Sequence, residues 1–377
     1  MTTTPNTTIG AGATTHGAAL PAPGGHTRLP RRALRVGPLS VVLRPLAIGV
    51  NLALLAALVV LFCLEIGLGD YPMSIPEVLA VLAGGGTRAQ QFIVHDLRLP
   101  RALTALLIGV ALAIAGALTQ SVSRNPLASP DILGITAGAS AAAVALLVLG
   151  GGGAFVGALA MLGLPLAALA GALATGAAIY LLSWRRGVEG YRLILVGIGI
   201  NAMLVAVTGW VMVSGDINDV SRAQVWLNGS VASANWSAVW PLAVAVAVLG
   251  AIALAGTFTL GVLRLGDENA ASLGIRLQAA QGAMLLVAVV LAAVATAAAG
   301  PVGFVALAAP QIAVRLTRAS GPPVVASALT GAVLVVGADL IARTVLPVEL
   351  PVGIVTSALG GPFLLYLLVR NNRKVTA

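Results

Sequence analysis

Charged residues are scarce in this chain of 377 residues, since only 9% of them are Asp, Glu, Lys or Arg. A soluble globular protein carries about 25% charged residues and uses them to cover its surface. Hydrophobic residues make up 59% of the chain, and its mean hydropathy is +1.01. The scarcity of charge excludes a soluble enzyme. It also excludes a single membrane anchor, because the apolar excess continues from about residue 46 to residue 369.

Three other scarce residue types exclude particular chemistries. Cys63 is the only cysteine, so neither a disulfide nor a CxxC metal cage can form within the chain. Lys374 is the only lysine, so there is no G-x-x-x-x-G-K-[ST] phosphate loop and no ATP hydrolysis of that kind. The three histidines, His16, His26 and His95, lie outside the apolar runs, which excludes HExxH sites and histidine relays in the membrane.

Acidic residues are nearly absent from the apolar runs. Glu65 lies near the end of the first run, and Asp339 precedes Arg343 by four residues, which places the two on one helix face. We therefore expect Asp339 to hold Arg343. A proton-driven transporter needs acids in the middle of the membrane, and a membrane transferase needs clustered carboxylates for a metal. The sequence contains neither set, which disfavours a membrane enzyme and an ion-coupled secondary transporter.

The apolar runs predict about ten transmembrane helices, since one span needs about 20 residues. Two spans are irregular: the third is short and ends in glycines, and the eighth contains Pro301 and Pro310. Broken helices are tolerated only where protein or water covers the freed backbone, so we expect both inside the bundle. The predicted spans are 46–69, 101–122, 134–150, 157–182, 191–213, 237–259, 281–299, 301–318, 324–346 and 353–369.

The distribution of basic residues orients this bundle. Ten spans place both termini on one side, and sixteen of the 21 basic residues fall on that side. Basic residues are enriched on the cytoplasmic side of membrane proteins, so the termini are predicted to be cytoplasmic. The predicted fold is therefore an all-α, multi-pass protein of the cytoplasmic membrane. The basic residues left outside are Arg88, Arg98, Arg101, Arg222 and Arg343.

The segments outside the spans have distinct compositions. Residues 1–45 are rich in Thr, Ala, Pro and Gly and end in arginines, which predicts a disordered basic cytoplasmic tail before a membrane domain at 46–370. Residues 371–377 form a second cytoplasmic tail, and the external loop 214–236 is long enough for a short surface helix. In the internal loop 260–280, Asp267 and Glu268 can begin a short helix that Gly274 closes. This loop is either a site for a cytoplasmic partner or an ordinary connector.

Polar residues gather where the second span ends. They indicate either an internal gate or a capped helix end, and the physical pattern alone favours the cap. The residues are Thr119, Gln120, Ser121, Ser123, Arg124, Asn125 and Pro126.

Six sequence segments together resemble the FecCD family, the membrane permeases of ATP-binding-cassette (ABC) importers for ferric siderophores, haem and cobalamin. The segments are RLPR (98–101), ALLIGVALAIAGALTQSVSRNPLASPDILGITAGAS (105–140), LILVGIGINAML (193–204), LRLGDENAASLGI (263–275), GPVGFVALAAPQIAVRL (300–316) and ADLIARTVLPVELPVGIVTSALGGPFLLYLL (338–368). NPLASPDILG and VWLNGSVASANW are most similar to permease subunits for ferric enterobactin, a catecholate siderophore. Many relatives have a histidine where this chain has Gln311, which leaves any role of that histidine in doubt here.

The resemblance implies a type II importer permease fold and three sets of site residues. Arg98, Arg101 and Arg343 would meet acidic residues of an extracytoplasmic binding protein, unless their duty is topology and packing. The gate region would contain Gln120, Asn125 and Pro126. The contact with the ATPase would consist of Gly266, Asp267, Glu268, Leu273 and Gly274.

The resemblance also implies the partners and the cargo. The partners would be a second permease subunit, identical or paralogous, two cytoplasmic ATPase subunits and the binding protein. The cargo would be a ferric siderophore of catecholate type, with haem or cobalamin as alternatives. The resemblance implies no catalytic residue, cofactor, resident metal or nucleic acid.

Overall fold

The computed structural model describes residues 32–36, 39–69, 71–150, 154–184, 190–345 and 348–372, which fall into two units, 1–44 and 45–377. In the first unit, β1 (Arg32–Val36) and β2 (Leu39–Leu43) form an antiparallel ladder with Arg32 opposite Leu43. This ladder differs from the predicted disordered tail. Leucine and valine flank a Gly-Pro turn signal at 37–38, a pattern that favours strand pairing. Residues 1–31 of the predicted tail lie outside the described residues.

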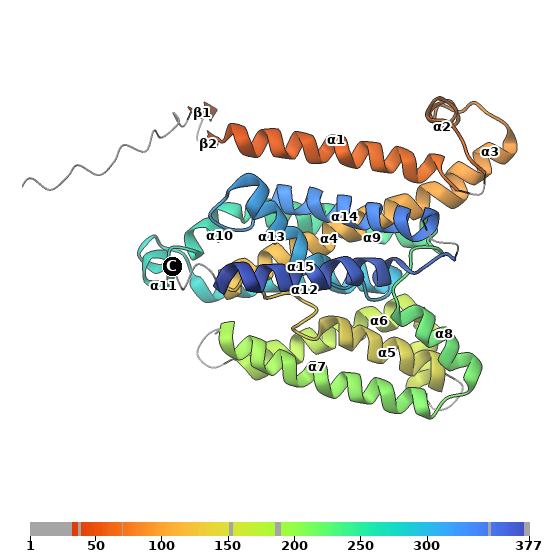
Figure 1. The fold of residues 1–377 in the computed structure, drawn as a ribbon. Helices are drawn as coiled ribbons and strands as arrows, with labels where there is room; N and C mark the ends of the chain where they lie inside the picture. Colours follow the sequence, from red (N-terminus) through yellow and green to blue (C-terminus); the bar gives the residue numbers. More distant parts are fainter. Residues whose placement is uncertain are drawn as a thin grey trace, which may run out of the picture. The chain divides into compact units, whose positions relative to one another are not determined.

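The second unit is built from helices that run side by side (Figure 1). They are α1 (Pro45–Gly67), α2 (Ile75–Leu82), α3 (Arg88–Phe92), the π-helical η1 (Ile93–Arg98), α4 (Leu99–Ser123), α5 (Ile135–Leu149), α6 (Ala154–Ser183), α7 (Gly190–Val213), α8 (Ile217–Leu227), α9 (Trp236–Ala255), α10 (Thr257–Leu263), α11 (Asp267–Ser272), α12 (Leu277–Ala299), α13 (Val305–Thr317), α14 (Val324–Thr344) and α15 (Val352–Asn372).

The predicted spans are confirmed by this architecture. Within the described residues, seven helices are long and apolar enough to cross a membrane, and three shorter apolar helices, in α5, α13 and α15, complete the predicted set of ten. The sixth predicted span divides at Gly256 into α9 and α10. Helix α6 contains a break at Gly163, whose φ of 76° is left-handed, so its apolar span begins there.

Helices α4, α12 and α14 form the centre of the bundle. Within the apolar window of each span, 78% of α4 is buried, against 6% of α1 and 17% of α7, so the last two lie at the periphery. The backbones of α4 and α14 touch, because a Cβ added to Gly109 would lie 2.4 Å from the Gly331 carbonyl oxygen. Small residues that let helices approach this closely drive association in membranes, where the hydrophobic effect contributes little.

The two irregular spans lie inside the bundle, as predicted. Every residue of α5 is buried or half-buried. In α13, Pro310 has no N–H, so the Ala306 carbonyl four residues earlier loses its helical donor. Gly116 of α4 covers this carbonyl so closely that an added Cβ would lie 1.7 Å from the oxygen. The helix break is therefore possible because α4 covers the freed backbone.

We expect the substitution Gly116→Ala to destabilise the protein by about 1–3 kcal/mol, because the new methyl group forces α4 and α13 apart. The matched control is Gly49→Ala on α1, where an added Cβ meets nothing within 4 Å. Thermal unfolding in detergent should show a lower midpoint for the first variant and an equal or higher one for the second. Equal midpoints for Gly116→Ala and the unaltered protein would contradict the packing argument.

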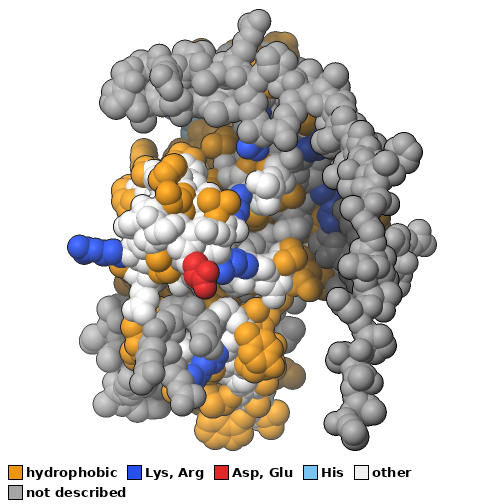
Figure 2. Space-filling view, turned by 90° about the vertical axis from the view of Figure 1, so that its left-hand side faces the viewer, with side chains coloured by type: hydrophobic (Ala, Val, Ile, Leu, Met, Phe, Trp, Pro, Cys, Tyr) orange, Lys and Arg blue, Asp and Glu red, His pale blue; other side chains and the backbone are white. Residues whose placement is uncertain are grey.

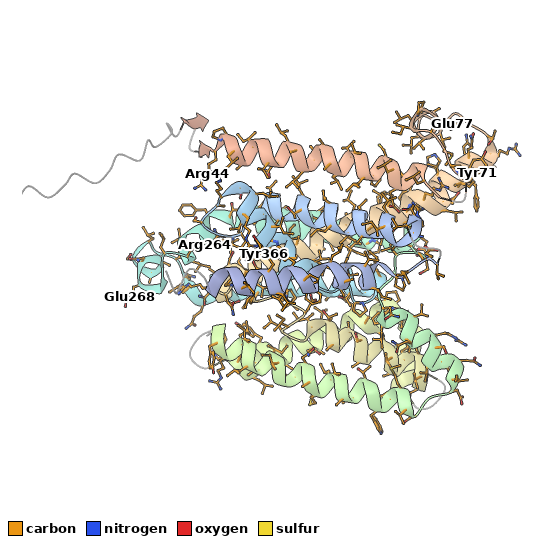
Figure 3. The ribbon with its side chains drawn as sticks, viewed as in Figure 1. Arg44, Tyr71, Glu77, Arg264, Glu268 and Tyr366 are labelled. Atoms are coloured by element: carbon orange, nitrogen blue, oxygen red, sulfur yellow. The ribbon has the colours of Figure 1, made fainter. Side chains whose placement is uncertain are left out.

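Short helices occupy the two ends of the bundle. The external loop contains α8 and the internal loop contains α11, as predicted; Gly274 closes α11 with a φ of 79°. Helices α2, α3 and η1, between the first two spans, were not predicted. Figure 1 places α2, α3 and α8 at one end and α10 and α11 at the other, and in Figure 3 Tyr71 and Glu77 lie opposite Arg264 and Glu268.

Candidate functional sites at the two ends of the bundle

The external end contains a cavity of about 1070 Å³, and the three arginines predicted to dock a partner all line it. Arg98 ends η1, Arg101 lies in the first turn of α4, and Arg343 lies in the last turn of α14. The fold therefore brings together three side chains that the sequence separates by up to 245 positions. Other lining residues include Tyr71, Asp96, Asn235 and Glu349.

Arg98 fastens the end of α1. Its Nη1 donates to the Ile66 and Gly67 carbonyls at 2.6 and 3.2 Å, and its Nη2 donates to the Tyr71 carbonyl at 2.7 Å. The last carbonyls of a helix lack intrahelical donors, and a cation satisfies them well. Because the side chain is buried, these bonds indicate that Arg98 organises the rim of the cavity.

Arg101 and Arg343 bind carboxylates of this chain. Arg101 forms a bidentate pair with Asp339 at 2.8 Å for both bonds, and its Nη1 donates to Glu349 at 2.5 Å. Arg343 donates to the Glu65 carbonyl at 2.6 Å and lies 3.3 Å from the Glu65 carboxylate. The expectation that Asp339 holds Arg343 is thus wrong. The planar guanidinium of Arg101 on α4 matches both oxygens of Asp339 and takes it instead.

The carboxylates around the cavity differ in their exposure. Asp339 is 1% exposed, whereas the side chain of Glu349 is 49% exposed and lies in the connection between α14 and α15. Buried charges must stay paired, whereas an exposed pair exchanges with other partners at little cost. Of the two carboxylates on Arg101, Glu349 is therefore the one that a competing carboxylate can replace.

Nearby, Glu77 has a local role. The backbone N–H and the hydroxyl of Ser74 both donate to the Glu77 carboxylate at 2.7 Å, and these bonds hold the pKa of Glu77 below its usual value. The pair forms a capping box that begins α2.

The cytoplasmic end contains a smaller pocket of about 300 Å³, and the predicted gate residues Gln120 and Pro126 line it. Gln120 donates to the Leu307 carbonyl at 3.1 Å, and Gln311 donates to the Gln120 side-chain oxygen at 2.7 Å. Gln311 therefore joins α13 to α4. Asn125 shapes the turn after α4, because its side-chain oxygen accepts from the Leu127 N–H at 2.9 Å. The capped helix end thus has a structural basis in this turn, and the gate stays a prediction.

The internal loop forms a compact cytoplasmic knob, which we define as α10, α11 and the residues up to Arg276. Val262, Leu263 and Ala270 form its small core. Among the predicted coupling residues, Gly266 and Gly274 have left-handed φ values of 105° and 79°, and Leu273 and Glu268 are exposed. Asp267 begins α11, but its side chain lies outside the described part. Figure 2 shows basic and apolar side chains around an acidic group on this end of the protein.

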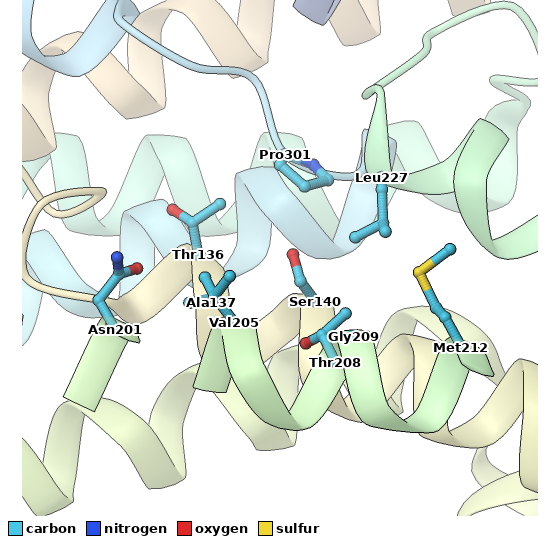
Figure 4. Close-up of a pocket in the computed structure, with 10 residues that line it drawn as sticks. All are labelled: Thr136, Ala137, Ser140, Asn201, Val205, Thr208, Gly209, Met212, Leu227 and Pro301. Carbon is cyan, nitrogen blue, oxygen red and sulfur yellow. The ribbon is translucent and has the colours of Figure 1, made fainter. Parts of the chain in front are cut away.

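Sequence reasoning missed a third cavity, of about 430 Å³, between α5 and α7 (Figure 4). Its lining contains hydroxyl and amide groups from Thr136, Ser140, Asn201 and Thr208, beside the apolar Met212, Leu227 and Pro301. Hydroxyls in a run of small residues look like helix-packing residues, so the sequence has no signal for this cavity. The described residues contain no group of three His, Cys, Asp or Glu side chains that could hold a metal ion.

Within the described residues, ten apolar helices with a cavity at each end and a helical knob at the cytoplasmic end are typical of a multi-pass membrane transport protein. Residues 57–370 match the model of the FecCD transport family, and the chain belongs to that family. This confirms the resemblance seen in the sequence.

Several characterised relatives are similar over most of their length. The ferric enterobactin transport system permease protein of Escherichia coli is 38% identical over 307 residues, which cover 81% of this chain and 91% of the relative. The iron(3+)-hydroxamate import system permease protein of Bacillus subtilis is 40% identical over 321 residues, 84% of this chain and 95% of the relative. The achromobactin transport system permease protein of Dickeya dadantii is 43% identical over 326 residues, 85% and 91% respectively.

A solved structure has the same fold. It is an inward-facing conformation of a putative metal-chelate type ABC transporter, with a TM-score of 0.72 and 25% sequence identity. The match covers 86% of this chain and 99% of the other. The predicted fold class, that of an ABC importer permease, is therefore confirmed.

Proposed function

We propose that this chain is the permease subunit through which an ABC importer moves a ferric siderophore of catecholate type into the cytoplasm. The observation that supports it most is the family match across residues 57–370, which begins within α1 and covers nearly all of the membrane bundle. The relatives' names cover enterobactin, hydroxamate and achromobactin systems, so the family match alone does not choose the siderophore. The choice of catecholate rests on the segments NPLASPDILG and VWLNGSVASANW.

The external cavity is the proposed seat of the binding protein. We assign docking to Arg98, Arg101 and Arg343, and we give these residues different roles. Arg98 and Arg343 donate to backbone carbonyls at the end of α1 and keep the rim in shape. Arg101 shares its guanidinium with the exposed Glu349, so a carboxylate of the binding protein would replace Glu349 there. Arginine–carboxylate pairs of this kind orient a partner and speed its association.

The cytoplasmic knob is the proposed contact with the ATPase subunits. Glu268 and Leu273 are exposed on it, while Gly266 and Gly274 provide the left-handed turns at its two ends. Its own apolar core would hold α10 and α11 together when the knob is displaced. The ATPase subunits, two per transporter, would then alternate the access of the pathway by pulling on this knob.

A second permease subunit, identical or paralogous, would complete the pathway. Helix α7, one of the two peripheral helices, favours this, because only 17% of its apolar window is buried. The cavity between α5 and α7 contains the half-buried amide of Asn201, and a polar group of this kind is costly to expose to lipid. A partner helix packed on α7 would remove that cost.

Deletion of the gene should abolish uptake of a ferric catecholate labelled with radioactive iron in the source cells, by at least about tenfold, because no other subunit can complete the pathway. A plasmid copy of the unaltered gene is the control and should restore uptake. Loss of hydroxamate, citrate, haem or cobalamin uptake in place of catecholate uptake would reassign the cargo within the family. Sensitivity of uptake to an uncoupler at constant ATP would contradict the ABC mechanism.

A further inference from the structure

Arg264, the residue that follows α10, reaches out of the cytoplasmic knob into the membrane bundle. Its Nη2 donates to the hydroxyl of Ser121 on α4 at 3.1 Å and to the carbonyl of Pro322, before α14, at 2.9 Å. One side chain therefore connects the knob with α4 and with the segment that leads into α14. Hydrogen bonds from a charged donor are stronger than neutral ones, so these contacts can carry force between the segments.

A second arginine makes the reverse connection. Arg124 ends α4 with a left-handed φ of 49°, and its Nε donates to the carbonyl of Leu263 at 3.1 Å. Leu263 is the last residue of α10 and belongs to the core of the knob. Two arginines thus join the knob and α4, so a displacement of one segment either moves the other or breaks these contacts.

The guanidinium of Arg264 also lies directly on the backbone of Gly321. A Cβ added to Gly321 would lie 2.5 Å from Cζ and from Nη1 of Arg264, so a larger residue would displace the guanidinium. At the same time, the buried Nε of Arg264 has no hydrogen-bond partner among the described residues. An unpaired buried donor costs free energy, so it weakens the contact. The guanidinium is therefore packed closely against Gly321, but its hydrogen bonding there is incomplete.

The contacts of Arg264 lie next to the gate network. Arg264, Ser121 and Gly321 line the same cytoplasmic pocket as Gln120 and Gln311. Ser121 is the neighbour of Gln120 in α4, and Gln120 holds α13 through the Leu307 carbonyl. A displacement of the knob would therefore reach the hydrogen bonds between α4 and α13 through a path of three consecutive contacts.

We propose that Arg264 is the positioning residue that transmits movement of the cytoplasmic knob to the gate between α4 and α13. The proposal rests on the proposed function, because it assumes that an ATPase moves the knob. Arg264 contacts neither cargo nor nucleotide in this role. It acts by keeping Ser121 and the Gly321–Pro322 backbone in fixed positions relative to α10.

The test measures whether ATP changes access to the cytoplasmic pocket. Ser320, which lines the pocket, is changed to cysteine in a Cys63→Ser background, and inside-out vesicles from the source cells are labelled with a membrane-impermeant maleimide. With Arg264 intact, we expect ATP plus vanadate to change the labelling rate about fivefold or more, the lower end of typical coupling between sites. With Arg264→Gln, the rate should no longer respond, while ATP hydrolysis stays within about twofold because the knob surface is unchanged.

Arg192→Gln is the matched control, because Arg192 belongs to α7, outside the knob, and its side chain makes no hydrogen bond or ion pair within the described residues. It should keep the full response. Gly321→Ala should abolish the response as Arg264→Gln does, and the double variant should be no worse than either, since both changes remove one contact. A full nucleotide response in Arg264→Gln would overturn the proposal. A lack of response with Arg264 intact would instead count against the proposed function.

Discussion

Arg101→Ala is expected to destabilise the protein by about 3–5 kcal/mol, because it leaves a buried carboxylate without a partner. Asp339 is 1% exposed, and both of its oxygens accept hydrogen bonds from Arg101. A lone carboxylate at this position cannot recover its hydration unless the bundle loosens there. Thermal unfolding of the purified protein in detergent should show the loss as a much lower midpoint.

Two further variants separate this buried pair from the exposed one. Glu349→Gln removes the half-exposed partner of the same guanidinium and should cost only about 0–1 kcal/mol. The double variant Arg101→Ala/Asp339→Ala should recover part of the stability lost by Arg101→Ala, because it removes the unpaired charge. If Arg101→Ala unfolds at the same temperature as Glu349→Gln, the pair with Asp339 is not a structural element and Arg101 serves docking alone.

The membrane helices were predictable because each buried or lipid-facing helix leaves a long apolar run in the sequence. The helices between the first two spans leave a weaker signal. Residues 74–77 and 87–90 both form capping boxes, S-x-x-E and T-x-x-Q, which mark the N-termini of α2 and α3. Their apolar residues were too few to indicate a buried cluster. Val78, Val81 and Val94 pack with Ile66 at the end of α1, and such a contact depends on the fold.

For the external arginines, the sequence predicts the location but not the bonding partners. The count of basic residues on each side predicts that they are external, and the fold gathers them around one cavity. Their partners could not be predicted, because Arg101 and Asp339 are 238 residues apart and a local rule assigns Asp339 to Arg343. The helix rule for residues four apart is worth only about 0.2–0.5 kcal/mol. A bidentate pair in a buried site overrides it easily.

The two ends of the protein differ in whether their candidate contact residues already have partners within the chain. At the external end, the arginines already have partners within the chain, so the proposed docking would exchange a carboxylate at Arg101. At the cytoplasmic end, Glu268 and Leu273 are exposed on a knob whose interior is closed. If the proposed contacts are right, the external surface would suit a partner that dissociates readily, and the knob a partner that stays bound.

Glu268→Arg, with Asp267→Arg in the same chain, is expected to lower iron uptake by at least about tenfold, since like charges placed against a partner cost several kcal/mol. The substitution faces the proposed ATPase contact, where Figure 3 places Glu268 at the tip of the cytoplasmic end. Its reason is electrostatic: two acids at the start of α11 become two bases beside a helix N-terminus that already carries partial positive charge. Uptake of radioactive iron and recovery of the ATPase with a tagged permease would both be measured.

The matched control for this charge reversal is Asp219→Arg on α8, which alters an acid near a helix start at the opposite, external end. Asp219 pairs with Arg222 at 3.6 Å on the surface, so its loss should change stability by less than about 1 kcal/mol and leave the ATPase bound. If the knob variant accumulates in the membrane and yet retains ATPase and uptake, the knob is only a connector. If it loses both while Asp219→Arg keeps both, the acidic start of α11 is part of the contact through which the ATPase drives the permease.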